Sequence, residues 1–392
     1  MIRLAIPYGH QWIDPEDIQA VEAVLQGDWL TQGPAVEAFE NKLAEYTGNQ
    51  FAVAFNSGTS ALHGAMFVCG VGPGDTVLTS PITFVASMNS ALYCGAKPLF
   101  ADIDLSTGCL DIPALLPQLE SLQRKHNLKA IVPVDLAGYP VDLQPLLQKA
   151  RALGITVIED AAHALGGIRQ GKKVGLEADM TMFSFHPVKH ITTGEGGAIV
   201  TDDAAFAQNL RIFRTHGITK SPGKMQKNEG PWYYEMQQLG FNYRLTDMAC
   251  ALGISQMEKL ETFLEKRNQI ANRYDLALGS HPLLRVPKRP EDGRHAFHLY
   301  PLLLDEKLDR KAFFQYLLDH EVRPQVHYIP VHLQPYYQKH FGFQPGDFPQ
   351  AEEYYSREIS IPMFPGLTDD EQQKVIDLTL EWVDHPAFRK EE

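Results

Sequence analysis

The fold can be read from Asp179-Met-Thr-Met-Phe-Ser-Phe-His-Pro-Val-Lys-His-Ile-Thr-Thr-Gly-Glu-Gly-Gly-Ala-Ile-Val-Thr201. An apolar strand comes first, followed by a polar turn with one lysine, a Gly-rich bend and a second strand. Lys189 lies in that turn, at the rim of the predicted sheet. Burial disfavours the charged form of an amine, so a lysine held against an apolar sheet has a lowered pKa. Such an amine is suited to forming a Schiff base with an aldehyde cofactor.

Two further stretches strengthen this interpretation, because a lone lysine is ordinarily a solvated surface group. Asp160 and His163 follow directly after the β-branched run Ile155-Thr-Val-Ile-Glu159. Asn56-Ser-Gly-Thr-Ser60 opens a predicted helix. Together the three elements supply a lysine, an acid for a pyridinium nitrogen and a cup for a phosphate, which favours pyridoxal phosphate as the cofactor.

Length and composition bound the class of protein. The chain has 392 residues, of which 44% are hydrophobic, enough for one large and one smaller domain. Its net charge of −13 argues against nucleic-acid or anionic-membrane partners, since the overall field repels phosphates. A phosphorylated ligand must therefore be bound by local groups.

The cysteines and the chain start predict the compartment. Cys69, Cys94, Cys109 and Cys250 are scattered, which indicates neither a metal site nor a disulfide framework. The apolar run in Met1–Pro7 is too short, and too early broken by proline, for a signal peptide, and no stretch reaches membrane length. We expect a soluble cytoplasmic protein.

From residue 50 onward, short β-branched or aromatic runs alternate with helical periods. The seven runs are Phe51–Phe55, Thr76–Thr79, Pro98–Ala101, Ala130–Val134, Ile155–Glu159, Met180–Phe185 and Ala198–Thr201. This alternation is typical of an α/β fold with a mostly parallel sheet between helices. Ligands in such folds bind beyond the carboxyl ends of the strands, where Thr59, Phe84, Asp160 and Ser184 fall.

The flanking segments read as helices and a second domain. Asp14 caps a helix with Ile18, Val21 and Leu25 on one face, and a second helix ends at Gly48. Further predicted elements are a helix over Thr246–Leu278, a strand over His298–Leu304, a helix over Arg310–Asp319, a loop over Gln325–Pro330 and a helix over Asp369–Val383. The domain change is placed near residue 255, giving domains 1–255 and 256–392.

Each candidate residue also has a purely structural interpretation. Asp160 can cap a short helix over 161–165, and His163 can bond Asp160, a ring hydroxyl, or only the surrounding protein. Asn56–Ser60 can be an ordinary helix cap. Phe84 can belong to the core or stack on an aromatic cofactor.

Over nearly its whole length the chain resembles the DegT/DnrJ/EryC1/StrS family of sugar aminotransferases, fold-type I pyridoxal-phosphate enzymes. The stretches that carry the resemblance are Leu30-Thr-Gln-Gly33, Phe55-Asn-Ser-Gly-Thr-Ser-Ala-Leu62, Glu159-Asp-Ala-Ala-His-Ala-Leu-Gly166, Phe183-Ser-Phe-His-Pro-Val-Lys-His-Ile-Thr-Thr-Gly-Glu-Gly-Gly197 and Gly240-Phe-Asn-Tyr-Arg-Leu-Thr-Asp247. The resemblance implies a large domain with a mostly parallel seven-stranded sheet and a smaller C-terminal α+β domain.

The resemblance also implies roles for individual residues. Lys189 would bind the cofactor aldehyde, Asp160 the ring nitrogen, and Phe84 would cover one ring face. The other cofactor residues would be Ser57, Gly58, Thr59, His163, Ser184 and, from the partner subunit of a homodimer, Asn242. The substrate residues would be Tyr8, Asp28, Trp29, Leu30, Thr31, Gly58, Ser184, Asn242, Arg244, Gln325, Val326, His327, Tyr328 and Tyr337.

Within the family, Ser-Phe-His-x-x-Lys and Gln325-Val-His-Tyr328 are most similar to the branch that serves pseudaminic acid synthesis. The implied reaction moves the amino group of L-glutamate to C4 of a UDP-linked 4-keto-6-deoxy N-acetylhexosamine. The alternatives are a C4 aminotransferase for another sugar of the aminoarabinose or perosamine type, a cofactor-dependent sugar dehydratase, and a non-enzymatic regulator. Lys189 counts against a dehydratase, since relatives of that type carry histidine there.

Overall fold

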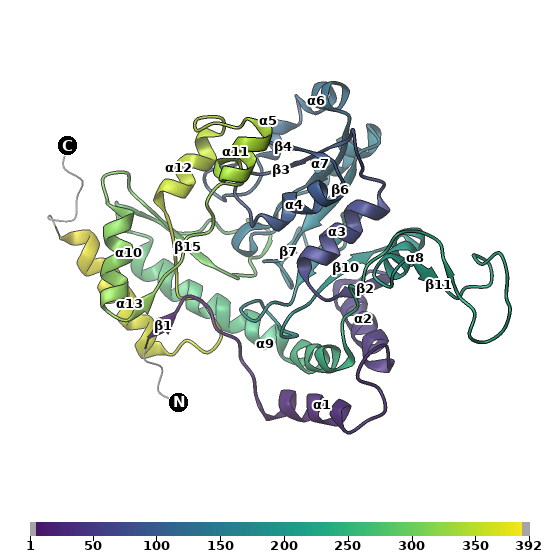
Figure 1. Cartoon of the computed structure of the whole chain (residues 1–392). Helices are drawn as coiled ribbons and strands as arrows, with labels where there is room; N and C mark the ends of the chain where they lie inside the picture. Colours follow the sequence, from purple (N-terminus) through teal and green to yellow (C-terminus); the bar gives the residue numbers. More distant parts are fainter. Residues whose placement is uncertain (1–4, 386–392) are drawn as a thin grey trace.

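A seven-stranded sheet forms the centre of the protein (Figure 1), as seen in a computed structural model that describes residues 5–385. Residues 1–4, which begin the segment expected not to be a signal peptide, lie outside that range. In spatial order the strands are β2 (Phe51–Phe55), β10 (Gly197–Thr201), β9 (Met180–Ser184), β6 (Thr156–Asp160), β5 (Leu128–Val132), β3 (Thr76–Thr79) and β4 (Lys97–Phe100). Only β10 runs against its neighbours, so the prediction of a mostly parallel sheet is confirmed.

Helices cover both faces of this sheet, because successive residues of a strand point to opposite sides. In β3, Val77 belongs to the buried core that also contains residues of α3, α4 and α8, whereas Leu78 belongs to the core on the opposite face, with residues of α6 and α7. The bounds of these helices are α3 (Gly58–Val68), α4 (Ala86–Tyr93), α6 (Leu119–His126), α7 (Gln144–Ala152) and α8 (Ala204–Phe213). The sheet is therefore buried on both sides and opens only at its ends.

Two N-terminal helices, α1 (Pro15–Leu25) and α2 (Pro34–Thr47), lie along the long helix α9 (Asp247–Leu278). The predicted helix capped by Asp14 is present, and its apolar face is largely uncovered: Ile18 is 60% exposed and Leu25 57% exposed. The side that faces α9 carries Asp17, which accepts hydrogen bonds from Ser255 (2.7 Å) and Gln256 (2.7 Å) and pairs with Lys259 of α9. A polar seam thus fixes α1 and leaves its apolar face uncovered.

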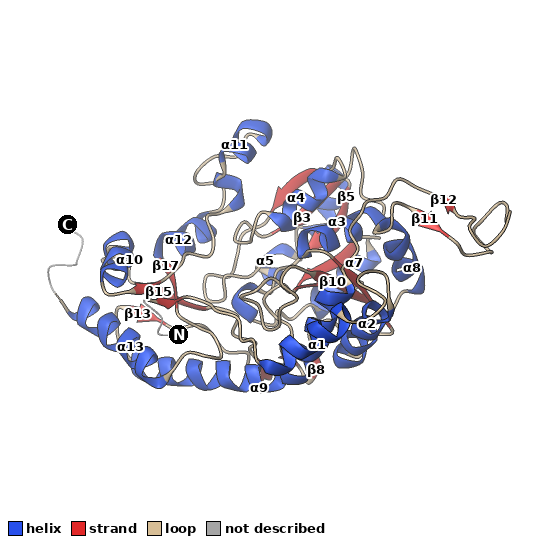
Figure 2. Ribbon diagram, turned by 60° about the horizontal axis from the view of Figure 1, so that its bottom comes forward, coloured by secondary structure: helices blue, strands red, loops and turns tan. Residues whose placement is uncertain are grey.

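The C-terminal part is built on β15 (Tyr300–Leu304), which pairs with β13 (Leu284–Arg285) and β17 (Glu358–Ile361). Helices α10 (Arg310–Asp319) and α13 (Asp369–Asp384) pack beside it, and α9 runs from it to the large sheet (Figure 2). The first described strand, β1 (Ile6–Pro7), joins this part by pairing in parallel with β16 (Val322–Arg323). The domain boundary at residue 255 remains a prediction.

Smaller elements complete the described chain. They are α5 (Ile112–Leu115), η1 (Leu136–Gly138), β7 (Ile168–Arg169), β8 (Lys172–Lys173), β11 (Ile218–Thr219), β12 (Glu235–Met236), β14 (Gly293–Arg294), η2 (Val331–Leu333), α11 (Pro335–Phe341) and α12 (Pro349–Arg357). The β11–β12 ribbon and its loop, here called the arm (residues 218–239), project from the body in both views (Figures 1 and 2). No helix within residues 5–385 combines the length and apolar character that crossing a bilayer requires.

Candidate active site

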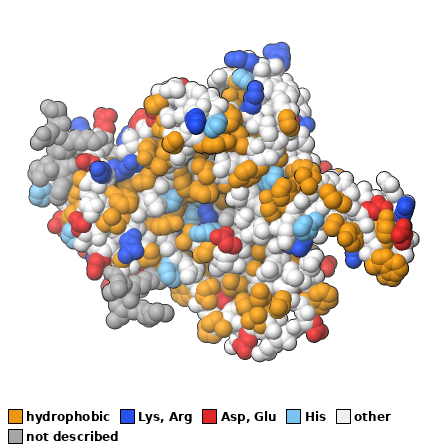
Figure 3. Space-filling model, viewed as in Figure 1, with side chains coloured by type: hydrophobic (Ala, Val, Ile, Leu, Met, Phe, Trp, Pro, Cys, Tyr) orange, Lys and Arg blue, Asp and Glu red, His pale blue; other side chains and the backbone are white. Residues whose placement is uncertain are grey.

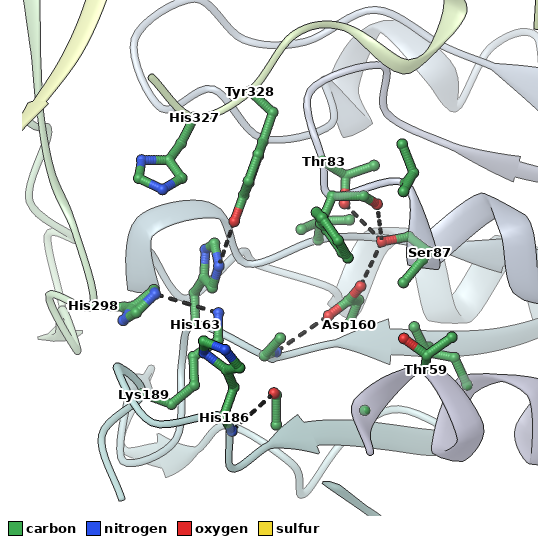
Figure 4. Close-up of a pocket in the computed structure, with 18 of the residues that line it drawn as sticks. Thr59, Thr83, Ser87, Asp160, His163, His186, Lys189, His298, His327 and Tyr328 are labelled. Atoms are coloured by element: carbon green, nitrogen blue, oxygen red, sulfur yellow. Dashed lines mark hydrogen bonds between the residues drawn. The ribbon is translucent and has the colours of Figure 1, made fainter. Parts of the chain in front are cut away.

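A cavity of about 640 Å³ opens where β2, β6 and β9 end (Figure 4). Predicted site residues that line it are Tyr8, Ser57, Gly58, Thr59, Phe84, Asp160, His163, Ser184, Lys189, Gln325, Val326, His327 and Tyr328. They come from the start of α3, the turn before α4, the ends of β6 and β9, the loop over 325–330 and the segment after β1. The expectation that the strand ends converge on one site is confirmed.

Lys189 lies in the turn after β9, where its backbone N–H donates to the carbonyl oxygen of His186 (2.9 Å). Its Nζ lies 3.3 Å from Nε2 of His298, and both residues line the cavity. Burial lowers the pKa of Lys189 to about 7, against the opposing attraction of Asp160. A substantial fraction of this amine is therefore uncharged near neutral pH, as a nucleophilic or proton-accepting lysine requires.

Asp160 is the last residue of β6 and is buried. Its Oδ2 accepts a hydrogen bond from Ser87 (2.6 Å) and its Oδ1 accepts one from the N–H of Ala162 (3.2 Å). Burial raises the pKa of Asp160, because these two bonds and the nearby Lys189 only partly offset the lost hydration. A cationic ring nitrogen would supply the missing compensation, so this carboxylate fits a pyridinium.

The structural alternative for Asp160 was wrong, since residues 161–165 form turns and not a helix. The N–H of Ala161 donates to the carbonyl oxygen of Met182 in β9 (2.9 Å), which holds the chain in line with the sheet. The bonds that follow, Ala164 to Ala161 and Gly167 to Ala164, span three residues and close separate turns.

His163 makes no hydrogen bond to Asp160 in the described chain. Its Nδ1 accepts from the N–H of Ala137 (3.2 Å), so its Nε2 carries the proton and donates to the hydroxyl oxygen of Tyr328 (3.1 Å). Burial lowers the pKa of His163 well below its usual value, with Lys189 adding repulsion, and the ring stays neutral. His163 therefore ties the loop over 325–330 to the sheet edge.

The phosphate cup predicted at residues 56–60 is the start of α3. Ser57 is the N-cap and exchanges hydrogen bonds with Ser60, so it has a capping role. A Cβ on Gly58 would lie 3.2 Å from the sulfur of Met182 and 3.3 Å from Cβ of Ser184. The neighbouring strand is thus so close that glycine fits best at this position of the cup. The N-terminal amides of α3, with Thr59 and Ser184 beside them, fit a phosphate.

Phe84 is not a core residue: 57% of its side chain is exposed, and it lies in the cavity wall. Its ring centroid is 6.0 Å from that of Tyr328. An aromatic ring exposed inside a cavity offers a flat apolar surface for another ring to stack on. The geometry favours the stacking alternative over the core one.

Several predicted residues lie elsewhere in the single chain. Asp28 to Thr31, Asn242, Arg244 and Tyr337 are not among the residues that line this cavity. Tyr337 is buried 6.0 Å from the ring of Phe100 and donates to Asn89 (2.7 Å), because the short helix α11 turns it towards the core. Arg244 lines a separate cavity of about 630 Å³ beside α2.

Other residues of the site were missed in the sequence. Ser87, which holds Asp160, lies three residues after Phe84, and that spacing of one helical turn was a usable signal. His298, which contacts Lys189, lies more than a hundred residues after it in the sequence, just before β15. Nothing in the local sequence pattern distinguishes this histidine.

The sheet, the buried lysine and acid and the cup at a helix start define an enzyme that uses pyridoxal phosphate. A model of the DegT/DnrJ/EryC1/StrS aminotransferase family matches residues 11–379. The chain belongs to this family and is a sugar aminotransferase, and the prediction of pyridoxal phosphate is confirmed. The family prediction made from the motifs is confirmed as well.

The chain is similar to two curated proteins along most of its length. It is 40% identical to the spore coat polysaccharide biosynthesis protein SpsC of Bacillus subtilis over 95% of each chain. It is also 40% identical to the UDP-4-amino-4,6-dideoxy-N-acetyl-beta-L-altrosamine transaminase of Campylobacter jejuni, over 91% of this chain and 92% of the other.

Two solved structures share the fold. Helicobacter pylori PseC, an aminotransferase of pseudaminic acid biosynthesis, has a TM-score of 0.88 and 33% identity, covering 96% of this chain and 98% of that one. Spr1654 of Streptococcus pneumoniae has a TM-score of 0.88 in its PMP form, with 30% identity, covering 95% of this chain and 98% of that one.

Proposed function

We propose that the protein transfers the amino group of L-glutamate to C4 of a UDP-linked 4-keto-6-deoxy N-acetylhexosamine. The product would be UDP-4-amino-4,6-dideoxy-N-acetyl-β-L-altrosamine, a precursor of pseudaminic acid. The observation that carries this proposal is that Gln325 to Tyr328, the segment most similar to that branch of the family, lines the same cavity as Lys189. The similarity to the Campylobacter jejuni transaminase supports the choice of sugar.

The cofactor would be held by residues already described. Pyridoxal phosphate, when bound, supplies a ring that accepts electrons from the carbon next to the transferred nitrogen. Asp160, fixed by Ser87, would keep the ring nitrogen protonated, and Phe84 would cover one face of the ring. Thr59, Ser184 and the amides that begin α3 would bind the phosphate.

Lys189 would then have two tasks, to hold the cofactor and to move protons. Its pKa of about 7 lets the free amine accept a proton from carbon and return it to another position without leaving the site. The histidines around it stay neutral, since burial lowers the pKa of His163 and His298 well below the usual value. They therefore add no positive charge that would oppose protonation of the lysine.

We further propose a homodimer whose two sites are shared. Asp28 to Thr31 and Asn242, predicted to bind substrate and cofactor phosphate, lie outside the cavity of their own chain and would serve the partner's. Apolar side chains that such an interface would cover are exposed: Trp29 (58%) and, on the arm, Trp232 (71%) and Leu239 (70%). Figure 3 shows hydrophobic side chains gathered at the arm and along the lower edge of the molecule.

A second candidate is the amination of a different nucleotide 4-keto sugar, of the aminoarabinose or perosamine type. The equal similarity to SpsC, a protein of polysaccharide synthesis, favours keeping this alternative. A dehydratase and a non-enzymatic regulator are less well supported, because Lys189 and Asp160 are both present and both face the cavity. In each case we propose action in the cytoplasm, where nucleotide sugars and reduced cysteines occur.

The test is incubation of the purified enzyme with pyridoxal phosphate, L-glutamate and a panel of UDP- and GDP-linked 4-keto sugars. Mass spectrometry detects the amino sugar and NMR establishes its configuration at C4. We expect the highest kcat/KM with the UDP-linked N-acetylated 6-deoxy sugar. A higher value with a sugar that lacks the N-acetyl group would replace the proposal by the second candidate.

A further inference from the structure

Behind the substrate side of the cavity, three side chains form a continuous hydrogen-bonded chain. Glu358 and Ser360 project from β17, and His327 belongs to the loop over 325–330. Oε1 of Glu358 lies 2.5 Å from Oγ of Ser360, and that Oγ lies 2.8 Å from Nδ1 of His327. Oε2 of Glu358 accepts the backbone N–H of His327 at 2.7 Å. All three residues are buried.

When Glu358 is protonated, the backbone N–H of His327 fixes the direction of the other hydrogen bonds among these three side chains. Because Oε2 is an acceptor, a proton on Glu358 must lie on Oε1 and be donated to Ser360. The serine hydroxyl then donates to Nδ1 of His327, and the proton of the neutral imidazole lies on Nε2. Burial lowers the pKa of His327 to about 3, so the ring carries one proton only.

Loss of the proton from Glu358 reverses the chain. The serine hydroxyl turns to donate to Oε1, Nδ1 of His327 takes the ring proton and donates to Ser360, and Nε2 becomes an acceptor. One proton leaves to solvent and every bond is kept. The nitrogen left for a ligand in the cavity thus changes from donor to acceptor.

We propose that Glu358 is a positioning residue that acts through Ser360 to make His327 present an Nε2–H donor to the sugar nucleotide. The group it would recognise is an oxygen without a hydrogen, in the N-acetyl carbonyl, the 4-keto group or the diphosphate. A substrate hydroxyl could rotate to suit either form of His327, whereas such an oxygen accepts only. The inference rests on the proposed function and names a contact within the same site.

The surroundings keep Glu358 protonated at neutral pH. Burial raises the pKa of Glu358 to about 8, although hydrogen bonds from Ser360 and from the backbone N–H of His327, and the guanidinium of Arg310 on α10, favour the charged form. The other titratable groups that face these side chains are Tyr354 of α12, Tyr328 of the loop and Tyr8, whose ring centroid lies 5.3 Å from that of His327; all three have raised pKa values and are uncharged. His163, also nearby, is neutral because burial lowers its pKa. From the cavity, Lys189 repels a proton on His327 and helps to keep it neutral.

The first experiment is nitrogen NMR of the holoenzyme labelled at histidine, between about pH 6.5 and 9.5, a range that brackets the Glu358 pKa. The His327 signal is identified by its loss in His327→Gln. We expect an Nε2–H ring at low pH and an Nδ1–H ring at high pH. Glu358→Gln should keep the Nε2–H form throughout, since its amide donates to Ser360 at every pH.

Matched variants distinguish an effect carried by the Glu358–Ser360–His327 hydrogen bonds from a general effect of substitution. Ser360→Ala should end the pH dependence of the His327 signal, and Ser360→Thr should restore it. Glu352→Gln, which alters a glutamate–histidine pair with His332 outside the cavity (3.0 Å), should leave the His327 signal unchanged. A single form of His327 across the pH range in wild type, or the same pH change in Glu358→Gln, would overturn the proposal.

The second experiment measures KM for the best nucleotide sugar over the same pH range. The KM of wild type should rise about tenfold above the transition, the effect of losing one hydrogen bond, whereas that of Glu358→Gln should not rise. A change of the His327 form without a change in KM would overturn the contact with substrate. Failure of every sugar to react would refute the proposed function. The NMR result would still decide whether Glu358 controls the ring form of His327 through Ser360.

Discussion

The two sides of the cavity are built differently. On the cofactor side, Asp160 is the last residue of β6 and Lys189 lies in the turn after β9. The substrate side comes from the loop over 325–330, and its other predicted residues, such as Asp28 to Thr31, lie outside the cavity. The comparison teaches that the reaction chemistry is fixed by the sheet, whereas the choice of sugar depends on loops and, in our proposal, on a second chain.

The largest effect should follow from Lys189→Ala, which removes the amine from the cofactor side. Turnover should fall about 10⁴-fold or more, since the anchor and the proton carrier are lost together. The phosphate cup is separate, so dialysis and absorbance should still show noncovalent cofactor binding. Lys125→Ala, on the exposed surface of α6, is the control. Near-normal activity of Lys189→Ala would exclude a catalytic lysine.

Asp160→Asn should have the next largest effect. The amide keeps the size of the side chain but cannot hold a ring nitrogen protonated, so kcat should fall about 10²-fold to 10³-fold with the fold retained. Circular dichroism checks folding, and steady-state kinetics measures the loss. An unchanged rate would mean that the acid serves only the turn after β6.

Asn242→Ala tests whether the other side of the comparison involves a partner subunit. Cofactor affinity should fall about tenfold, the effect of one hydrogen bond to phosphate. At a cofactor concentration too low to load Asn242→Ala alone, an equal mixture with Lys189→Ala should recover about a quarter of wild-type activity after subunit exchange, because half the dimers are mixed and each has one intact site. No recovery despite proven exchange would place Asn242 in its own chain's site.

The smallest effect on activity is expected from a substitution on the arm. Trp232→Ser removes an exposed ring that our dimer would bury, and should raise the dimer dissociation constant by about tenfold or more. Analytical ultracentrifugation at low concentration measures this shift, and kcat at saturating protein should remain within about twofold of wild type, since the arm contributes no group to the cavity of its own chain. Leu276→Ser, at an 85% exposed position on α9, is the control. A wild-type protein that is a fully active monomer would contradict the proposed homodimer.

The sequence was sufficient for the sheet and for the residues at its strand ends, because buried parallel strands are apolar runs and the catalytic groups follow them directly. It correctly placed the helix α1 but did not reveal that Asp17, and not the apolar face, joins this helix to α9. The helix expected after Asp160 is absent, because Ala161 bonds to β9. His298 could not be found, since only tertiary structure brings it to Lys189.

The pairing of β1 with β16 has a consequence for how the protein is made. Ile6 is synthesised more than three hundred residues before its partner Val322. The strands of the large sheet all lie between residues 51 and 201 and can assemble while β1 waits. β1 can therefore pair only after the whole large sheet has been synthesised, and a fusion tag attached directly before it should disturb the C-terminal part and not the sheet.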